Sequence, residues 1–102
     1  MILKAEIYVS EDSDGINGFI GLIDNYIAGV FARKGKRSKG IGKQLIDFVK
    51  CQYNNLTLDV FVKNIRAVDF YIREGFQIQR KSINYDTQEE EYTMCCKVKI
   101  KE

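Results

Sequence analysis

The order of strand-like and helix-like segments is the feature that most constrains how this chain of 102 residues folds. Three strand-like segments come first, and two helical patterns then flank a single short strand. Two more strand-like segments follow. This order predicts one domain, residues 1–102, with a mixed sheet of the α/β or α+β class. The strand-like segments are 3–10, 16–24, 25–32, 56–62, 76–86 and 91–100.

The two helical segments are recognised by apolar residues at helical spacing. The first begins at Ile41, after a basic stretch, and runs for about three turns. The second has Asn64 as a candidate N-cap and Gly75 as a candidate C′ residue. The apolar positions are Ile41, Leu45, Phe48 and Val49 in the first segment, and Ile65, Val68 and Ile72 in the second.

The first strand-like segment alternates between apolar and polar residues. Leu3, Ala5, Ile7 and Val9 fall on one side of it, and the residues between them fall on the other side. Because successive side chains of a strand point to opposite faces of the sheet, this pattern predicts a half-buried strand.

Composition argues against several classes of protein. The net charge is only +2, so a cationic coat for nucleic acid is not implied. No apolar run approaches the ~20 residues that a membrane span needs, and no signal segment is recognised at the N-terminus. The chain has no histidine, and Cys51, Cys95 and Cys96 lack the spacing of a metal site or a disulfide framework. We therefore expect no metal and a cytoplasmic location.

A basic, glycine-rich stretch precedes the first helical segment. Six cationic side chains and three glycines lie between Arg33 and Lys43, with no acidic residue among them. A loop that opens a helix presents backbone N–H groups and the positive end of the helix dipole, so this stretch is a candidate anion site. Arg37, Gly40 and Gly42 form an R-x-x-G-x-G pattern within it. The alternative interpretation is a solvated basic turn.

Two familiar phosphate-binding patterns do not fit this stretch. A P-loop would need lysine after its second glycine, where Ile41 follows Gly40. The dinucleotide-binding fingerprint, begun at Gly40, would need a third glycine where Leu45 stands.

A second motif, N-x-x-A-x-x-F-Y-x-x-x-G-F, runs from Asn64 to Phe76. Together with the R-x-x-G-x-G pattern and the strand between them, it resembles the GNAT superfamily of acyl-CoA-dependent N-acyltransferases, over residues 5–97. The resemblance implies a mixed, mostly antiparallel sheet flanked by two helices. It also implies an acetyltransferase in which an amine attacks acetyl-CoA directly, in a ternary complex.

The resemblance assigns roles to individual residues. The backbone of residues 30–32 (Val30, Phe31 and Ala32) would pair with the pantetheine arm, and Asn64 would contact that arm or order the separating strands. A strand N–H would polarise the acetyl carbonyl, and Tyr71 would protonate the departing thiolate. The residues assigned to the pyrophosphate are Arg37, Ser38, Lys39, Gly40, Ile41, Gly42 and Lys43.

Simpler interpretations stand beside these roles. In these interpretations Asn64 serves only as a helix cap, and Tyr71 is only a core aromatic residue. The alternative function is an acyl-CoA-binding module that does not turn over and acts through protein interaction. An RNA-binding protein is a weaker alternative, because the net charge is low and no RNA-motif aromatic pair is present.

The N-terminal region departs from the family pattern. The chain starts close to the second family strand, so the resemblance implies a truncated form without the usual first strand and two helices. The uncovered edge of residues 3–10 would invite pairing with another chain, which predicts a homodimer. No Asp, Glu or His lies between Asn25 and Ala32, so this reasoning identifies no general base.

Overall fold

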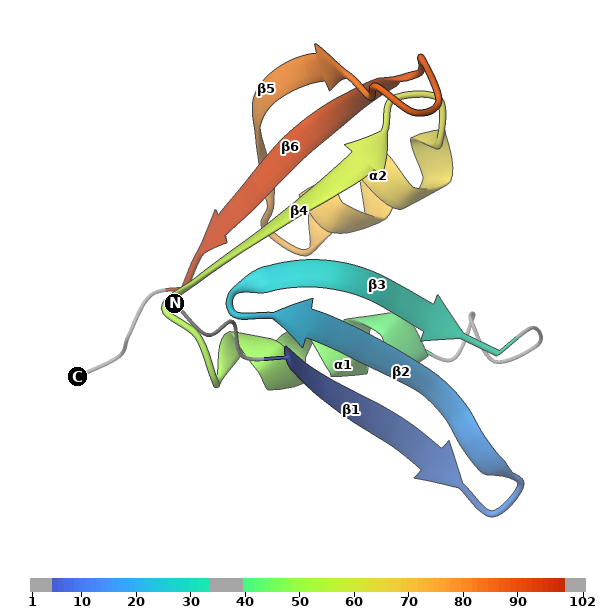
Figure 1. Cartoon of the computed structure of the whole chain (residues 1–102). Coiled ribbons are helices and arrows are strands. Elements are labelled where there is room, and N and C mark those ends of the chain that lie inside the picture. Colours follow the sequence, from blue (N-terminus) through green and yellow to red (C-terminus); the bar gives the residue numbers. More distant parts are fainter. Residues whose placement is uncertain (1–4, 34–39, 99–102) are drawn as a thin grey trace.

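A computed structural model describes residues 5–33 and 40–98 of the chain. Its strands form one sheet in the order β1-β2-β3-β4-β6-β5 (Figure 1). The elements in chain order are β1 (Ala5–Asp12), β2 (Gly15–Ile23), β3 (Tyr26–Ala32), α1 (Ile41–Lys50), β4 (Asn55–Phe61), α2 (Ile65–Arg73), β5 (Gln77–Ile83) and β6 (Glu90–Lys97).

The predicted fold class is confirmed. The pairings β1–β2, β2–β3, β4–β6 and β5–β6 are antiparallel, and only β3 and β4 pair in parallel among the described residues. The parallel pair is connected through α1, as a crossover between parallel strands requires. The predicted ends of the second helix are also confirmed, since Asn64 caps α2 and Gly75 follows it with a φ of +97°.

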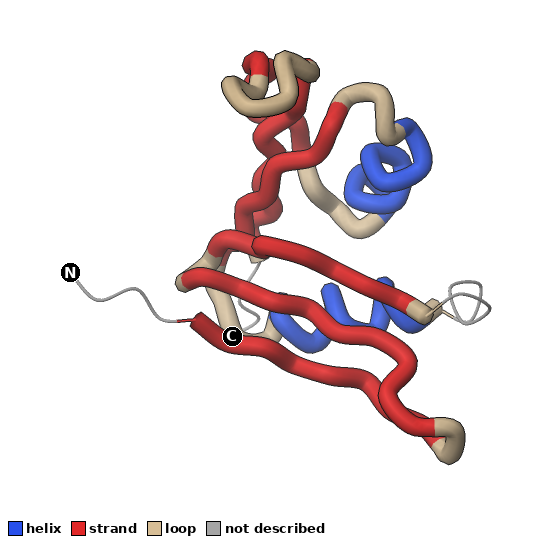
Figure 2. Tube along the Cα trace, turned by 45° about the vertical axis from the view of Figure 1, so that its right-hand side comes forward, coloured by secondary structure: helices blue, strands red, loops and turns tan. Residues whose placement is uncertain are grey.

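Both helices pack on the same face of the sheet, which we call the inner face (Figures 1 and 2). α1 covers β1, β2 and β3, and α2 lies against β4. The core lies between these layers. Its fully buried members are Ile20, Leu22, Ile46, Val49, Leu56, Leu58 and Met94.

β1 is half-buried as predicted, but its apolar side does not face the core. Tyr8 points inward and packs edge-on against Phe48 of α1, with ring centroids 4.9 Å apart. Ile7 and Val9 lie on the opposite, outer face and are 72% and 53% exposed. The alternation indicated a strand with two unlike faces, but the position of α1 determines which of them is covered.

Gly18 is required where α1 crosses β2. A Cβ at this position would lie 2.7 Å from Cγ2 of Ile41 and 2.8 Å from the backbone oxygen of Phe31. The second contact cannot relax without disturbing the pairing of β2 with β3, so replacement by alanine would overpack the core. We expect Gly18→Ala to lower the free energy of unfolding by about 1–3 kcal/mol, as measured by urea denaturation. An unchanged midpoint and slope would contradict this packing.

The sheet opens between β3 and β4. In the described residues the two strands are paired at one position only, Tyr26 with Thr57. A hydrogen bond of 3.0 Å from the Thr57 N–H to the Asn25 carbonyl supports this pair. Beyond that pair the strands separate (Figure 1). One edge of β3 therefore runs toward α1 without a neighbouring strand along it in the described part of the chain.

Candidate functional site

A cavity of about 770 Å³ lies between the end of β3, the start of α1 and the length of α2. This volume is typical of sites that hold a small molecule or cofactor. The structure brings together eight of the residues singled out from the sequence, which all line this cavity: Val30, Phe31, Ala32, Gly40, Gly42, Lys43, Asn64 and Tyr71. Arg37, Ser38 and Lys39 lie outside the described residues.

The N-terminus of α1 presents backbone N–H groups to this cavity. Its N-cap residue is Gly40, which has a φ of +76° and makes no side-chain capping bond. Glycine adopts this left-handed conformation without the steric cost that other residues incur. The N–H groups of the first helical turn are therefore positioned, with the helix dipole, to receive an anion. Ile41 can contribute only its backbone, because its side chain is buried in the core.

Gly42 has a packing role that the sequence did not reveal. A Cβ built on Gly42 would lie 3.2 Å from the tip of the Phe70 ring on α2. The absence of a side chain thus lets the two helices approach each other at the cavity. Close approach of a ligand to this backbone remains a prediction.

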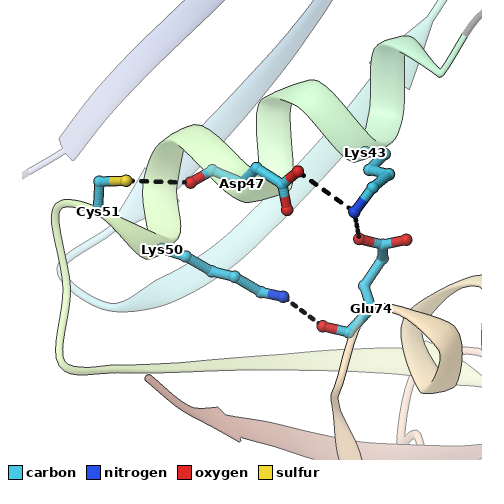
Figure 3. Close-up of polar contacts among 5 residues, drawn as sticks. All are labelled: Lys43, Asp47, Lys50, Cys51 and Glu74. Carbon is cyan, nitrogen blue, oxygen red and sulfur yellow. Dashed lines mark hydrogen bonds and ion pairs between the residues drawn. The ribbon is translucent and has the colours of Figure 1, made fainter. Parts of the chain in front are cut away.

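Lys43 lies at the cavity but its ammonium group contacts carboxylates. Nζ is 3.2 Å from Oε1 of Glu74 and 3.3 Å from Oδ2 of Asp47 (Figure 3). The hydrogen bond to Glu74, followed by that to Asp47, raises the pKa of Lys43. The Lys50 ammonium donates to the backbone carbonyl of Glu74 as well. α1 and the end of α2 are therefore tied together beside the predicted phosphate site.

Asn64 is both a helix cap and a cavity residue. Its Oδ1 accepts a 3.3 Å hydrogen bond from the Ala67 backbone N–H. The capping interpretation is thus confirmed, and it uses only the oxygen of the side chain. The Nδ2 group is a donor that a carbonyl of a bound ligand could accept from.

Tyr71 lies on α2, two helical turns beyond Asn64, and lines the same cavity. Its ring packs edge-on against Phe70 and Phe76, at centroid distances of 5.3 and 5.6 Å. Burial raises the pKa of Tyr71, so the hydroxyl keeps its proton at neutral pH. Tyr71 is therefore a partly buried aromatic residue that also holds a proton donor at the cavity wall.

The end of β3 contributes to the cavity mainly through its backbone. Phe31 stacks on Phe19 across the outer face of the sheet, with ring centroids 5.4 Å apart. Val30 and Ala32 pack against the core from the inner face. In the described residues β3 pairs with β4 only at Tyr26, so β4 does not run along this edge near Val30 and Phe31. An exposed strand edge of this kind is a place where an extended ligand can add as a further strand.

Asp59 is a candidate functional residue that the sequence reasoning missed. It lies on β4, two residues beyond the last β3–β4 pair, on the outer face of the sheet. Its Oδ2 accepts a 3.0 Å hydrogen bond from the Tyr26 hydroxyl, and its Oδ1 accepts one of 2.7 Å from Thr93. Burial, and then this bond to Asp59, raise the pKa of Tyr26 to about 12, so Tyr26 remains a donor at neutral pH. The sequence signal for Asp59 was that it is the one acidic residue of the β4 strand and lies on its exposed side.

Two kinds of feature are absent from the described residues. No group of His, Cys, Asp and Glu side chains within 5–33 and 40–98 is arranged to hold a metal ion. No helix in the same part of the chain is long and apolar enough to cross a membrane.

The fold and the cavity define a class of protein in which diverging strands and a helix N-terminus border one cavity, an arrangement suited to an extended, anionic ligand. Within that class the family is clear. Residues 4–78 match the family model described as "Acetyltransferase (GNAT) domain", and the chain belongs to this family.

Curated relatives agree with the family assignment. The chain is 31% identical over 78 residues to the peptidyl-lysine N-acetyltransferase YiaC of Escherichia coli K12, covering 76% of this chain and 53% of the relative. It is 32% identical over 80 residues to the peptidyl-lysine N-acetyltransferase YjaB of Salmonella typhimurium LT2, covering 78% and 55% respectively. The chain thus matches about half the length of these relatives.

A solved structure extends the likeness to the fold. A protein from Bacillus anthracis strain Ames, assigned as a streptothricin acetyltransferase and solved with acetyl coenzyme A, superposes with a TM-score of 0.82 at 25% identity. The match covers 91% of this chain and 62% of that one.

Proposed function

We propose that this chain is an acyl-CoA-dependent N-acetyltransferase that transfers the acetyl group of acetyl-CoA to a primary amine. The observation that carries the proposal is a cavity at which the end of β3, the N-terminus of α1 and Tyr71 meet. Each of these suits a different part of acetyl-CoA: the amide-bearing arm, the pyrophosphate and the thioester. The acetyl-CoA complex of the related structure supports the same donor.

The coenzyme enters from the inner face in this proposal. Its pyrophosphate lies against the first turn of α1, and Arg37, Ser38 and Lys39 are the further residues that the family resemblance assigns to it. Its pantetheine arm pairs with the backbone of residues 30–32, and Asn64 donates from Nδ2 to an arm carbonyl. The thioester then reaches the opening between β3 and β4, close to Tyr71. Lys43 would exchange its contact with Glu74 for one with phosphate.

The reaction needs no covalent enzyme intermediate. The amine nitrogen attacks the acetyl carbonyl carbon, and charge develops on the carbonyl oxygen, where a strand N–H stabilises it. The C–S bond then breaks, and Tyr71 donates its proton to the departing thiolate. The new amide nitrogen loses a proton. That proton goes to water. Before the attack, the ammonium form of the amine must also lose a proton, and we assign Asp59 as the group that receives this one, because it lies on the outer face two residues beyond the β3–β4 pair.

Asp59→Asn tests this last assignment. We expect turnover at neutral pH to fall by about a hundredfold, at the low end for general bases. A lysine-type amine has a pKa near 10.4, so the deficit should shrink as the pH rises and the amine loses its proton unaided. Thiol release measured from neutral to alkaline pH gives this profile. A deficit that is constant with pH would assign Asp59 a structural role only. Thr93→Val is the matched control, because it removes one hydrogen bond to Asp59 and keeps the carboxylate.

The second candidate is an acyl-CoA-binding module without turnover. The contacts of Asp59 favour it, because both of its carboxylate oxygens already accept hydrogen bonds, from Tyr26 and from Thr93, which leaves fewer lone pairs for a substrate proton. Native mass spectrometry with acetyl-CoA tests the cavity under both functions. A thiol-release screen against lysine peptides, polyamines, aminoglycosides and amino acids then separates them, since only the enzyme releases CoA. Absence of binding by mass spectrometry would reject both.

The relatives' names guide the choice of acceptor. Both curated relatives are named peptidyl-lysine N-acetyltransferases, so lysine-containing peptides are the first acceptors in our proposal. The proposal also includes a cytoplasmic location, where acetyl-CoA is available, and a homodimeric assembly.

A further inference from the structure

The opening between β3 and β4 divides the sheet into two halves, β1–β2–β3 and β4–β6–β5 (Figure 1). Within the described residues the backbones of these halves pair only between Tyr26 and Thr57. The side chain of Asn25 adds a hydrogen bond to that of Asn55, close to this pair. Any link further into the opening must therefore come from a side chain that reaches across it.

Tyr26 provides such a link. Its hydroxyl donates a 3.0 Å hydrogen bond to Oδ2 of Asp59, which lies two residues beyond Thr57 on β4. A tyrosine side chain has only two torsion angles, so it holds its hydroxyl at a nearly fixed distance from its own strand. The Asp59 carboxylate is thus located relative to β3, although Asp59 belongs to the other half of the sheet.

β3 is also the strand that carries part of the proposed coenzyme site. Val30, Phe31 and Ala32, whose backbone is proposed to pair with the pantetheine arm, follow Tyr26 on this strand. The bond from Tyr26 therefore relates the position of Asp59 to the strand along which the thioester would lie. Such placement matters because a general base acts at hydrogen-bond distance, about 2.6–3.2 Å from the atom that gives up the proton.

We propose that Tyr26 is a positioning residue of the transfer reaction, whose hydroxyl holds the Asp59 carboxylate where it takes the proton from the ammonium form of the acceptor. This inference rests on the function proposed above, and it adds a residue that neither family motif contains. The proton passes from the ammonium nitrogen to a carboxylate oxygen of Asp59 and then to water. The amine keeps the electron pair that attacks the acetyl carbonyl, and the proton of Tyr26 stays on its own oxygen.

The hydrogen bonds to Asp59 leave room for this proton. A carboxylate offers about four lone-pair positions, and the contacts in the structure use one on each oxygen, from Tyr26 at Oδ2 and from Thr93 at Oδ1. One position on each oxygen remains for the ammonium group. Thr93 lies directly opposite Asp59 on β6, in the same half of the sheet. Its bond therefore does not locate the carboxylate relative to β3, and the bond from Tyr26 does.

The Tyr26 hydroxyl keeps its proton over the range in which an acceptor amine titrates. Burial, and then the hydrogen bond to Asp59, are the main causes that raise its pKa to about 12, whereas a lysine-type amine has a pKa near 10.4. Two charged residues lie on the neighbouring strands. Glu91 on β6 also raises the pKa of Tyr26, and Arg80 on β5 lies opposite Thr93. The bond to Asp59 thus persists from neutral pH to pH values at which the amine loses its proton unaided.

A double-mutant cycle tests this role by thiol release from acetyl-CoA with a lysine-containing peptide as acceptor. Tyr26→Phe should lower turnover at neutral pH by about tenfold, as expected for the loss of one hydrogen bond to a charged group, while the KM for acetyl-CoA stays within a fewfold. In the Asp59→Asn background the same substitution should change turnover by less than about twofold, because the group that Tyr26 positions is gone. The Tyr26→Phe deficit should also shrink toward alkaline pH, as the amine deprotonates without help.

Tyr85→Phe is the matched control, because it removes a hydroxyl from a tyrosine that is 93% exposed between β5 and β6, and it should leave turnover unchanged. If Tyr26→Phe lowered turnover equally in both backgrounds and at every pH, Tyr26 would be a structural residue and the proposal would be overturned. Wild-type turnover in Tyr26→Phe, alongside an impaired Asp59→Asn, would overturn the role of Tyr26 and leave the proposed function standing. Absence of thiol release by the wild type would reject the proposed transfer, and the role of Tyr26 with it.

Discussion

Tyr71→Phe is expected to lower turnover by about a hundredfold while the affinity for acetyl-CoA stays within a fewfold of wild type. The substitution removes only the hydroxyl and keeps a ring that packs against Phe70 and Phe76. General acids typically contribute about a hundred- to ten-thousandfold. We expect the low end of that range, because a thiolate with a pKa near 8.5 is already a tolerable leaving group.

The pH dependence adds a second check on Tyr71. Burial raises its pKa, so the acid form persists at pH values up to and beyond the ordinary value of 10.0. The wild-type rate should therefore show no loss from Tyr71 between neutral pH and pH 10. Thiol release and calorimetry on the same preparations measure turnover and affinity. Equal turnover in the two proteins would leave Tyr71 as a core aromatic residue, and so would a joint loss of binding and thermal stability.

Gly42→Val is expected to weaken acetyl-CoA binding by about 10- to 100-fold. The branched side chain would stand at the first turn of α1, where N–H groups are proposed to hold the pyrophosphate. A hydrogen bond to a charged group contributes about 1.5–3 kcal/mol, so loss of one such contact gives an effect of this size. Isothermal titration calorimetry with CoA measures it.

The packing role of Gly42 calls for a control, because its Cβ would also press on Phe70. Phe70→Leu makes room for the valine side chain. If the glycine serves only helix packing, the double variant Gly42→Val with Phe70→Leu should bind CoA as Phe70→Leu alone does. If the coenzyme must approach the backbone without a side chain at position 42, the double variant should still bind CoA weakly. Full recovery of affinity would remove Gly42 from the coenzyme site.

Local features of the fold were predictable because they depend on neighbours in the sequence. Helical spacing identified α1 and α2, and the alternation of apolar and polar residues identified β1. Asn64 and Gly75 were identified as the ends of α2 because a cap and a left-handed residue act within one turn. The two family motifs, in order and with a strand between them, were sufficient to suggest the family that the matched model shows.

The candidate site was predictable only in part. The sequence placed Gly40, Asn64 and Tyr71 at a common site, and the structure puts all three at one cavity. It did not indicate that Lys43 contacts Glu74, a residue 31 positions away. It also gave no reason to connect Asp59 with Tyr26, because their contact depends on the parallel pairing of β3 and β4.

The sequence by itself therefore determined the order of the elements, the helix ends and several of the residues that line the cavity. Only the tertiary structure decided which face of each strand is covered. Alternation put Ile7 and Val9 on the apolar side of a half-buried strand. They lie on the outer face, because α1 packs on the side of Tyr8. Alternation distinguishes two faces of a strand, but the path of the chain after β3 determines where the helix lies. The same path brings Phe70 against Gly42, and no local pattern records a contact between two helices.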